Sequence, residues 1–336
     1  MAAGAARHAG LVRVALALAP LVLLGCVAQI APPAGPWQTA LGRAHPLVGR
    51  VWDVGGAAFV EPGALVTALA RPRFVLLGEK HDNPDHHRLQ AWVVEALIAG
   101  GRRPAVAFEM LTSDQAPAIA GYVATAPADA GGLGEAVGWK RSGWPDWAMY
   151  RPIAAAALRA GLPIVPANLP PAVIRVLRER GPAALDPRLV ARHRLDQPPP
   201  PAVGEAMATE IREAHCGHAR EEIIPAMVLV QRARDARMAE ALLEIGGEGA
   251  VLIAGAGHVR KDRGVPAYLD AAGAGGVTAS LAFVEVADGA TAASDHAARF
   301  GATALPFDYV WFTPRLEDTD PCEKFRRALE ELRERK

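Results

Sequence analysis

Residues 73–90 read RFVLLGEKHDNPDHHRLQ, and this stretch predicts a buried strand followed directly by a helix. The apolar run Phe74–Leu77 is short and continuous, which is typical of a strand that is covered on both faces of a sheet. Asn83 stands where a helix N-cap is expected, and Pro84 occupies the first helical position. The apolar residues behind them recur at helical spacing: Leu89, Trp92, Val93 and Leu97. The stretch is therefore one βα unit.

Three further apolar runs each lead into a polar residue. They are residues 104–108 before Glu109, residues 162–167 before Asn168, and residues 250–254 before the turn 255–258. Short apolar runs that alternate with longer helical patterns predict an α/β protein with a mostly parallel central sheet flanked by helices. In such sheets the ligand crevice lies outside the carboxyl ends of the strands. We therefore expect one rim of the sheet to carry Glu79, His81, Glu109, Asn168 and His258.

Other helical patterns are predicted to be structural. Apolar stripes indicate helices over residues 151–161, 170–180 and 221–243, and the proline-rich residues 197–201 connect two helical patterns, so we expect an additional helical segment beside the sheet. In the longest of these helices one polar face could reach the crevice, although charge pairing on a solvated face is the commoner explanation. That face holds Gln231, Arg234, Asp235 and Met238.

Composition excludes several classes of protein. Hydrophobic residues make up 51% of the 336 residues, which excludes a largely disordered chain. Lys+Arg and Asp+Glu both number 36, so the net charge is zero, and no long run of one sign occurs. Nucleic acid is therefore not an expected partner, because it requires a basic surface that neutralises phosphates.

The amino-terminal segment has the pattern of a bacterial lipoprotein signal peptide. Basic residues precede an apolar run at residues 14–24 that is too short to span a bilayer, and residues 23–26 resemble a lipobox. We expect residues 1–25 to be the signal peptide, Cys26 to carry a lipid such as palmitate, residues 26–38 to form a tether, and residues 39–336 to form one domain. An ordinary cleaved signal or a buried anchor helix is the alternative. The expected location is the cell envelope, lipid-anchored to the outer membrane and facing the periplasm.

The carboxyl-terminal residues 321–336 predict a surface helix that docks by one stripe, Phe325, Leu329 and Leu332. Export would allow Cys216 and Cys322 to close a disulfide, but two separately buried thiols are an equal alternative, because the sequence contains no distance.

The residue types at the predicted rim exclude several mechanisms. None of the four serines lies in a G-x-S-x-G turn, and no dinucleotide fingerprint, phosphate-binding loop, C-x-x-C or H-E-x-x-H motif occurs. The remaining catalytic candidates are Glu79, His81, Glu109 and His258, as general acids and bases around a bound water. Three of them, Glu79, His81 and His258, are also candidate ligands of a divalent metal.

Charged groups near these candidates indicate what kind of ligand the rim of the sheet would bind. The positive end of the helix that begins at Pro84 would favour an anion and would keep His81 neutral. Beside the last strand, Arg260, Lys261 and Arg263 indicate that a carboxylate or phosphate docks there, unless they belong to a solvated loop.

Residues 78–90 resemble the signature of the ChaN family of haem-binding, iron-regulated lipoproteins. Shorter segments in the same order extend the likeness over roughly residues 40–315: residues 45–50, 107–109, 168–170, 231–239, 255–260 and 307–313. The ChaN family is similar in turn to a wider group that contains erythromycin esterases and the Tiki metalloproteases. The resemblance implies a membrane-anchored lipoprotein that binds haem in iron acquisition, with no turnover required and with a pocket that two subunits could share as a homodimer.

The resemblance also implies a tyrosine as the axial ligand of ferric haem, with basic or imidazole groups at the propionates. The tyrosines are Tyr122, Tyr150, Tyr268 and Tyr309. Tyr150 is the first choice, because it follows residues 144–149, whose aromatic side chains could flank a porphyrin. Candidates for the propionates are Lys80, His86, His87 and Arg260, although His86 and His87 could simply be solvated or hydrogen-bonded helix residues. A second hypothesis, which need not exclude the first, is a metal-dependent hydrolase built on Glu79, His81, Glu109 and His258.

Overall fold

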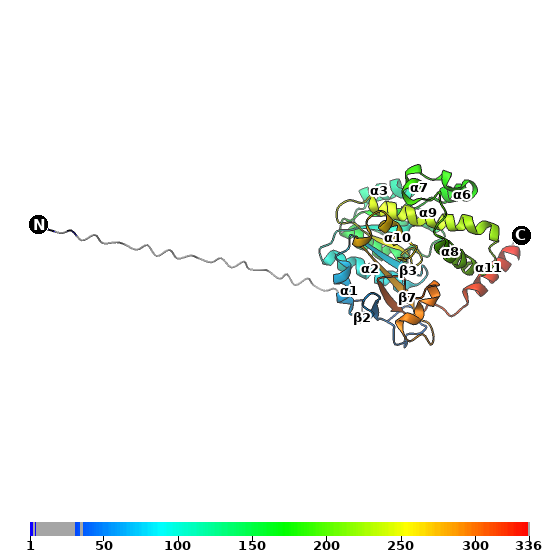
Figure 1. Ribbon diagram of the computed structural model, residues 1–336, viewed down its shortest axis with the longest axis horizontal. Helices are drawn as coiled ribbons and strands as arrows, with labels where there is room; N and C mark the ends of the chain where they lie inside the picture. Colours follow the sequence, from blue (N-terminus) through cyan, green and yellow to red (C-terminus); the bar gives the residue numbers. More distant parts are fainter. Residues whose placement is uncertain (3, 5–30, 34–35, 335–336) are drawn as a thin grey trace.

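The computed structural model describes residues 1–2, 4, 31–33 and 36–334 (Figure 1). In this part of the chain an eight-stranded sheet has the order β2-β1-β8-β7-β3-β6-β4-β5. The strands from β8 to β5 run parallel to their neighbours, whereas β1 is antiparallel to β2 and to β8. The strands are β1 (Val51–Asp53), β2 (Ala58–Val60), β3 (Phe74–Glu79), β4 (Ala105–Thr112), β5 (Ile164–Asn168), β6 (Ala250–Gly255), β7 (Thr278–Glu285) and β8 (Tyr309–Thr313). The predicted α/β class with a mostly parallel sheet is confirmed.

Helices cover both faces of this sheet. They are α1 (Pro62–Leu69), α2 (Pro84–Ala99), α3 (Ala116–Thr125), α4 (Leu133–Ala136), α5 (Trp147–Arg159), α6 (Pro171–Arg180), α7 (Pro187–His193), α8 (Pro201–Ala214), α9 (Ile224–Leu243), α10 (Val265–Ala271) and α11 (Pro321–Glu334). Along β3, Val75 and Leu77 join the core formed with α1, α2 and α5, whereas Phe74 and Leu76 join the core formed with α9 and α10. This alternation buries every apolar residue of the strand, as a parallel sheet covered on both sides requires.

Helix α2 begins as the sequence predicts. The Asn83 side chain accepts hydrogen bonds from the backbone N–H groups of Asp85 and His86, and Pro84 is the first helical residue. The predicted apolar set, Leu89, Trp92, Val93 and Leu97, is buried. The amide of Asn83 also donates to Glu285 Oε1 at 2.8 Å, which ties the start of α2 to the end of β7.

The additional helical segment lies outside α9. Leu177 of α6 and Leu189 of α7 share a small core with Val230 of α9, and Figure 1 shows these two helices along one side of α9. Ile211 of α8 packs with Ile224 at the start of α9. The predicted helical segment is therefore confirmed as a layer that packs on α9 rather than directly on the sheet.

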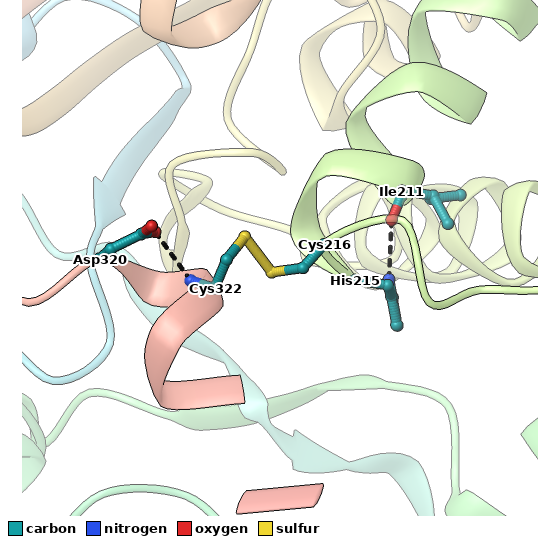
Figure 2. Close-up of a disulfide and its surroundings, with 5 residues drawn as sticks. All are labelled: Ile211, His215, Cys216, Asp320 and Cys322. Carbon is teal, nitrogen blue, oxygen red and sulfur yellow. Dashed lines mark hydrogen bonds between the residues drawn. A yellow bond between two sulfur atoms is a disulfide. The ribbon is translucent and has the colours of Figure 1, made fainter. Parts of the chain in front are cut away.

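A disulfide joins Cys216, just after α8, to Cys322 in the first turn of α11 (Figure 2). Of the two alternatives that the sequence leaves open, the structure therefore shows the bridge. The Phe325 ring of α11 stacks on His218 with the ring centres 5.8 Å apart. The carboxyl-terminal helix is thus held against the α8 region by one covalent bond and by aromatic contacts of Phe325 with His218 and His215.

The start of the chain is described only in part. Cys26 and most of the predicted signal peptide lie outside the described residues. Described residues of the predicted tether contact α2. Ala31 O accepts from the Trp92 indole at 2.8 Å, and Gln38 N donates to Asp85 Oδ1 at 3.0 Å. Within the residues that the structure describes, no helix combines the length and the apolar character needed to cross a membrane.

Candidate functional site

The predicted polar groups meet at the carboxyl edge of four adjacent parallel strands. Glu79 ends β3, Asn168 ends β5, and His258 follows β6 in a turn. Glu109 differs slightly from the expectation, because β4 continues past it to Thr112, and the register of β4 with β5 shifts between Phe108 and Thr112. The structure brings these side chains together in two clusters, each built around one buried carboxylate.

Glu79 is the centre of the first cluster. Its Oε1 accepts hydrogen bonds from His81 Nδ1 at 2.9 Å and from the Tyr150 hydroxyl at 2.8 Å, and its Oε2 lies 3.0 Å from His87 Nδ1. Burial alone would raise the pKa of Glu79, but the charge of His87 and the hydrogen bond from His81 outweigh burial and lower that pKa to about 2. Glu79 is therefore an ionised carboxylate that accepts two side-chain hydrogen bonds and lies within ion-pair distance of the His87 imidazole.

Glu109 is the centre of the second cluster. Its Oε2 accepts from the backbone N–H of Gly255 at 2.8 Å, and its Oε1 lies 3.3 Å from His258 Nε2. The other ring nitrogen of His258 lies 2.6 Å from Asp235 Oδ1. Burial opposes the charge of His258, but the two carboxylates outweigh it and raise the pKa of His258 well above its ordinary value. The imidazole is therefore held protonated between Glu109 and Asp235.

Asp235 decides between two alternatives that the sequence leaves open. The polar face of this helix could be solvated or could reach the crevice, and Asp235 is buried against His258, as the second alternative requires. Burial raises the pKa of Asp235 to about 6, although the charge of His258 opposes that rise. The sequence named Asp235 only as one of four residues on a face that could reach the crevice, and its place within the 231–239 segment of the family resemblance was a further signal.

Gly255 allows the two clusters to approach each other. A β-carbon at this position would lie 2.9 Å from His81 Nε2 and 3.6 Å from Glu109 Oε2. Such an approach to His81 is closer than packed side chains allow, so any side chain here would displace the imidazole. The absence of a side chain at Gly255 therefore places His81 beside Glu109.

Three histidines lie between the end of β3 and the first turn of α2, and the protonation of His81 differs from the expectation. The helix start was expected to keep His81 neutral, but the hydrogen bond to Glu79 and the charge of Glu109 outweigh the effect of burial and raise the pKa of His81. The neutral imidazole is instead His86, because burial lowers its pKa well below the ordinary value. His86 Nδ1 accepts from Lys80 N at 2.9 Å, and Nε2 lies 2.9 Å from Thr313 Oγ1. For the pKa of His81, the direct contacts with Glu79 and Glu109 therefore decide the direction, and the expected effect of the helix dipole does not.

Burial also removes His86 and His87 from any surface. Both side chains are almost completely inaccessible, and His87 Nε2 lies 2.9 Å from the backbone oxygen of His81. Of the predicted propionate ligands on this segment, only Lys80 is partly exposed, and its amine pairs with Asp82 at 2.7 Å. The two buried histidines therefore support the site through contacts within the protein and are not accessible to a ligand.

Tyr150 lies in the interior. It was expected to follow an exposed loop, but α5 begins at Trp147 with Asp146 as its N-cap, and this early start directs Tyr150 inward. The ring is fully buried, the hydroxyl donates to Glu79, and burial raises the pKa of Tyr150. The structure places this phenol where it orients Glu79, whereas the other three tyrosines are partly exposed.

The basic residues after β6 are likewise committed to partners within the protein. Arg260 is 1% exposed and donates to both carboxylate oxygens of Asp262 and to Phe300 O. Lys261 pairs with Asp308, and Arg263 pairs with Glu210 at 2.7 Å. The expectation that these cations face an incoming anion is not met, because neighbouring acids neutralise each of them.

The predicted metal ligands do not converge on a common point, because each contacts other groups of the protein. Among the residues that the structure describes, no group of three or more histidine, cysteine or acidic side chains is arranged to hold a metal ion. The physical reason is that the carboxylates at this rim already accept from imidazoles, a phenol and a backbone N–H.

A cavity of about 750 Å³ lies beside the edge of the sheet that carries the two carboxylate clusters. Its aromatic lining consists of Trp139, Trp144 and Trp147, and its basic lining consists of Lys140, Arg141 and Arg151; Glu135 and Asp146 also contribute. None of the three cations forms an ion pair within 4 Å in the described part of the chain. The Trp144 ring meets the His81 ring edge-on, with centres 4.8 Å apart. We call this cavity the tryptophan pocket.

Comparison with known proteins gives one family and one clear structural match. The family model described as "Haem-binding uptake, Tiki superfamily, ChaN" matches residues 65–269. The solved structure of ChaN of Campylobacter jejuni, described as showing cofacial haem binding, has a TM-score of 0.62 and 20% identity, and the match covers 78% of this chain and 95% of that chain. No curated protein matches.

Two other solved structures match with lower scores. The type III effector HopBA1 has a TM-score of 0.41 and 15% identity, covering 75% of this chain and 92% of its own. A mutant of the erythromycin esterase EreC in its open conformation has a TM-score of 0.36 and 14% identity, covering 66% and 72%. The match to the Campylobacter jejuni structure, at 20% identity, indicates the fold alone.

Proposed function

Because this chain belongs to the haem-binding uptake family of the Tiki superfamily, the ChaN family, we propose that it binds haem as cargo in iron acquisition. The observation that carries the proposal is the family match over residues 65–269. The tryptophan pocket supports it, because a porphyrin requires flat apolar contacts and its propionates require cations.

The residues of the tryptophan pocket fit both requirements. Trp144 and Trp147 would contact the porphyrin, and Lys140, Arg141 and Arg151 would face the propionates. For the iron ligand we favour Tyr122 over the buried Tyr150. The Tyr122 hydroxyl accepts from the backbone N–H of Gly132, directly after Gly131 in the pocket wall. Haem would supply ferric iron, for which a phenolate oxygen is a suitable hard donor.

A haemin titration tests this proposal. Wild-type protein is expected to shift the Soret band, and Trp144→Ala is expected to weaken binding about tenfold, because an aromatic contact is lost from the pocket. Tyr122→Phe is expected to change the ferric spectrum, whereas Tyr150→Phe should leave it unchanged. Trp37→Ala is the matched control, since Trp37 does not line the pocket. Equal affinities of all four variants and the wild type would contradict the proposal.

The lipid anchor and the location remain part of this proposal. We propose that Cys26 is acylated and holds the domain at the outer membrane, facing the periplasm, where two copies could share haem as a homodimer. The signal-peptide pattern supports export, and so does the Cys216–Cys322 disulfide, because such bonds persist in oxidising compartments. In cells that express the full chain, Cys26→Ser is expected to move the protein from the membrane fraction to the soluble fraction. An unchanged distribution would contradict lipidation, and light scattering with and without haemin would test the dimer.

A second candidate function rests on the Glu109–His258–Asp235 contacts. A protonated imidazole between two buried carboxylates is a suitable proton donor to a leaving group. Glu79 and His81 would orient an attacking water, and the Glu109 carboxylate would accept the proton that this water loses. This is the hydrolase hypothesis, and the contacts favour general acid–base chemistry. With a panel of carboxylic and phosphate esters, His258→Asn is expected to lower hydrolysis about 100-fold and to leave haemin affinity unchanged. Equal rates for the wild type and this variant would contradict it.

A further inference from the structure

Two smaller cavities, of about 300 and 310 Å³, open beside the Glu109–His258 pair. The first is lined by Asp235 and His258, and the second by Glu109 and Asn168. Both cavities are also lined by the same two arginines, Arg178 of α6 and Arg234 of α9. These two cations therefore stand where the two cavities meet, next to the second carboxylate cluster.

Among the described residues, Arg178 and Arg234 have no acidic partner, and neither has Arg175 of α6, which lines only the second cavity. Arg263, which also lines the first cavity, pairs with Glu210 and Asp262. On α9 itself, Arg232 donates to backbone oxygens of Gln197 and Arg194, and Arg237 pairs with Glu244.

Arg178 and Arg234, by contrast, form no ion pair or hydrogen bond with any residue in the described ranges, and Arg234 Nε is buried without a partner. A buried donor without an acceptor costs free energy, which a bound anion would recover.

The walls of the first cavity indicate what kind of molecule would carry the anion. Met207 and Ile211 of α8 and Val230 of α9 line it with apolar surface, and the side-chain oxygen of Gln231 is buried there without a donor. An apolar wall that ends at two unpaired guanidinium groups suits a molecule with an apolar body and one anionic end.

We propose that Arg178 and Arg234 form a binding site for the carboxylate or phosphate of an amphipathic acid, beside Glu109 and His258. The guanidinium groups hold the anion, and the α8–α9 wall holds the apolar body. This site is separate from the tryptophan pocket except for Trp144, which also lines the second cavity. Its anion has two sources with the same chemistry, a free organic acid or the propionates of haem. The proposal goes beyond haem binding, since a free acid can bind whether or not haem does.

Calorimetric titration with octanoate tests the free acid. Wild-type protein is expected to bind octanoate more tightly than acetate, because only octanoate reaches the apolar wall. Arg234→Ala and Arg178→Ala are each expected to weaken octanoate binding about tenfold or more, which is the usual effect of losing a charge-assisted hydrogen bond. Arg234→Lys should retain part of the affinity. The matched controls are Arg237→Ala on α9 and Arg180→Ala on α6, because neither residue lines the two cavities.

A parallel titration compares haemin with its dimethyl ester, which lacks the charged propionates. If the propionates of haem are the anion that this site binds, wild-type protein is expected to bind haemin more tightly than the ester and to bind octanoate only weakly. The preference for haemin is then expected to disappear in Arg178→Ala and Arg234→Ala. Either result supports the site. The proposal is overturned if neither octanoate affinity nor the preference for haemin depends on the two arginines, or if the control variants lose as much. Absence of haemin binding with intact octanoate binding would contradict the proposed function and leave this site standing.

Discussion

Replacing Glu79 with leucine is expected to lower the free energy of unfolding by about 3–5 kcal/mol, the usual cost of removing one partner from a buried ion pair. Two imidazoles with raised pKa values, His81 and His87, would lose the carboxylate that stabilises their charge. The Tyr150 hydroxyl would lose its acceptor in a fully buried position. Urea denaturation at pH 7 measures the effect.

A surface pair provides the control for this experiment. Glu95 of α2 pairs with Arg159 at 3.1 Å, with both side chains substantially exposed, so Glu95→Leu should change stability by less than about 1 kcal/mol. Glu79→Gln should lie between the two variants, since it retains the shape but not the charge. If Glu79→Leu costs no more than Glu95→Leu, Glu79 is not the electrostatic centre that the structure indicates.

The pH dependence adds a second check. Because the pKa of Glu79 falls from its ordinary 4.5 to about 2 on folding, its ionisation stabilises the folded state above pH 4.5, and that contribution is lost as the pH falls through about 2. The stability difference between wild type and Glu79→Leu should therefore shrink between pH 4.5 and pH 2. The raised pKa values of His81 and His87 affect stability at higher pH. Their protonation contributes fully to the free energy of unfolding below pH 6.5, and this contribution is lost as the pH rises through their folded pKa values.

The fold was largely predictable because its strongest determinants are local. The apolar run of β3 and the Asn83–Pro84 helix start are properties of neighbouring residues, and the structure contains both. The antiparallel edge strands were not predicted, because β1 and β2 are only three residues long and the pairing of β1 with β8 joins distant parts of the chain. Short strands without a distinctive pattern depend on partners that a single sequence does not identify.

The site was predictable only in its outline. Strand ends place Glu79, Glu109 and His258 at one rim, because parallel strands share a direction. The role of His86 depends instead on Thr313, which lies 227 residues away, and that of Asp235 depends on the turn that carries His258. Such long-range partners decide whether a polar side chain is exposed, paired or buried.

Charge shows the same limit of sequence analysis. Arg260, Lys261 and Arg263 form the evident basic cluster, yet Asp262 in the same loop pairs with Arg260, and Asp308 and Glu210 from other segments pair with Lys261 and Arg263. Arg234 stands in a sequence of alternating charges that suggests a solvated helix face, yet its Nε is buried without a partner among the described residues. Three-dimensional pairing, rather than local density of charge, therefore determines which cations are available to a ligand.

Gly264→Ala is the second substitution with a large expected effect, a loss of about 3 kcal/mol in the free energy of unfolding. A β-carbon at Gly264 would lie 2.4 Å from the backbone oxygen of His258 and 2.8 Å from that of Arg260. Both contacts are with backbone, which cannot move aside as a flexible side chain can. The His258 oxygen also accepts from Val265 N at 2.7 Å, so the turn that positions His258 would have to open.

Gly276→Ala is the matched control, because a β-carbon there meets nothing within 4 Å. Thermal and urea unfolding of both variants measure the difference in stability, and the imidazole signals of His258 in an NMR spectrum report whether its contacts with Glu109 and Asp235 change. We expect Gly264→Ala alone to shift those signals, because displacement of the His258 backbone moves the ring away from two carboxylates at once. Equal stability of the two variants with unchanged His258 signals would show that the turn tolerates a side chain and that it does not hold His258 in place.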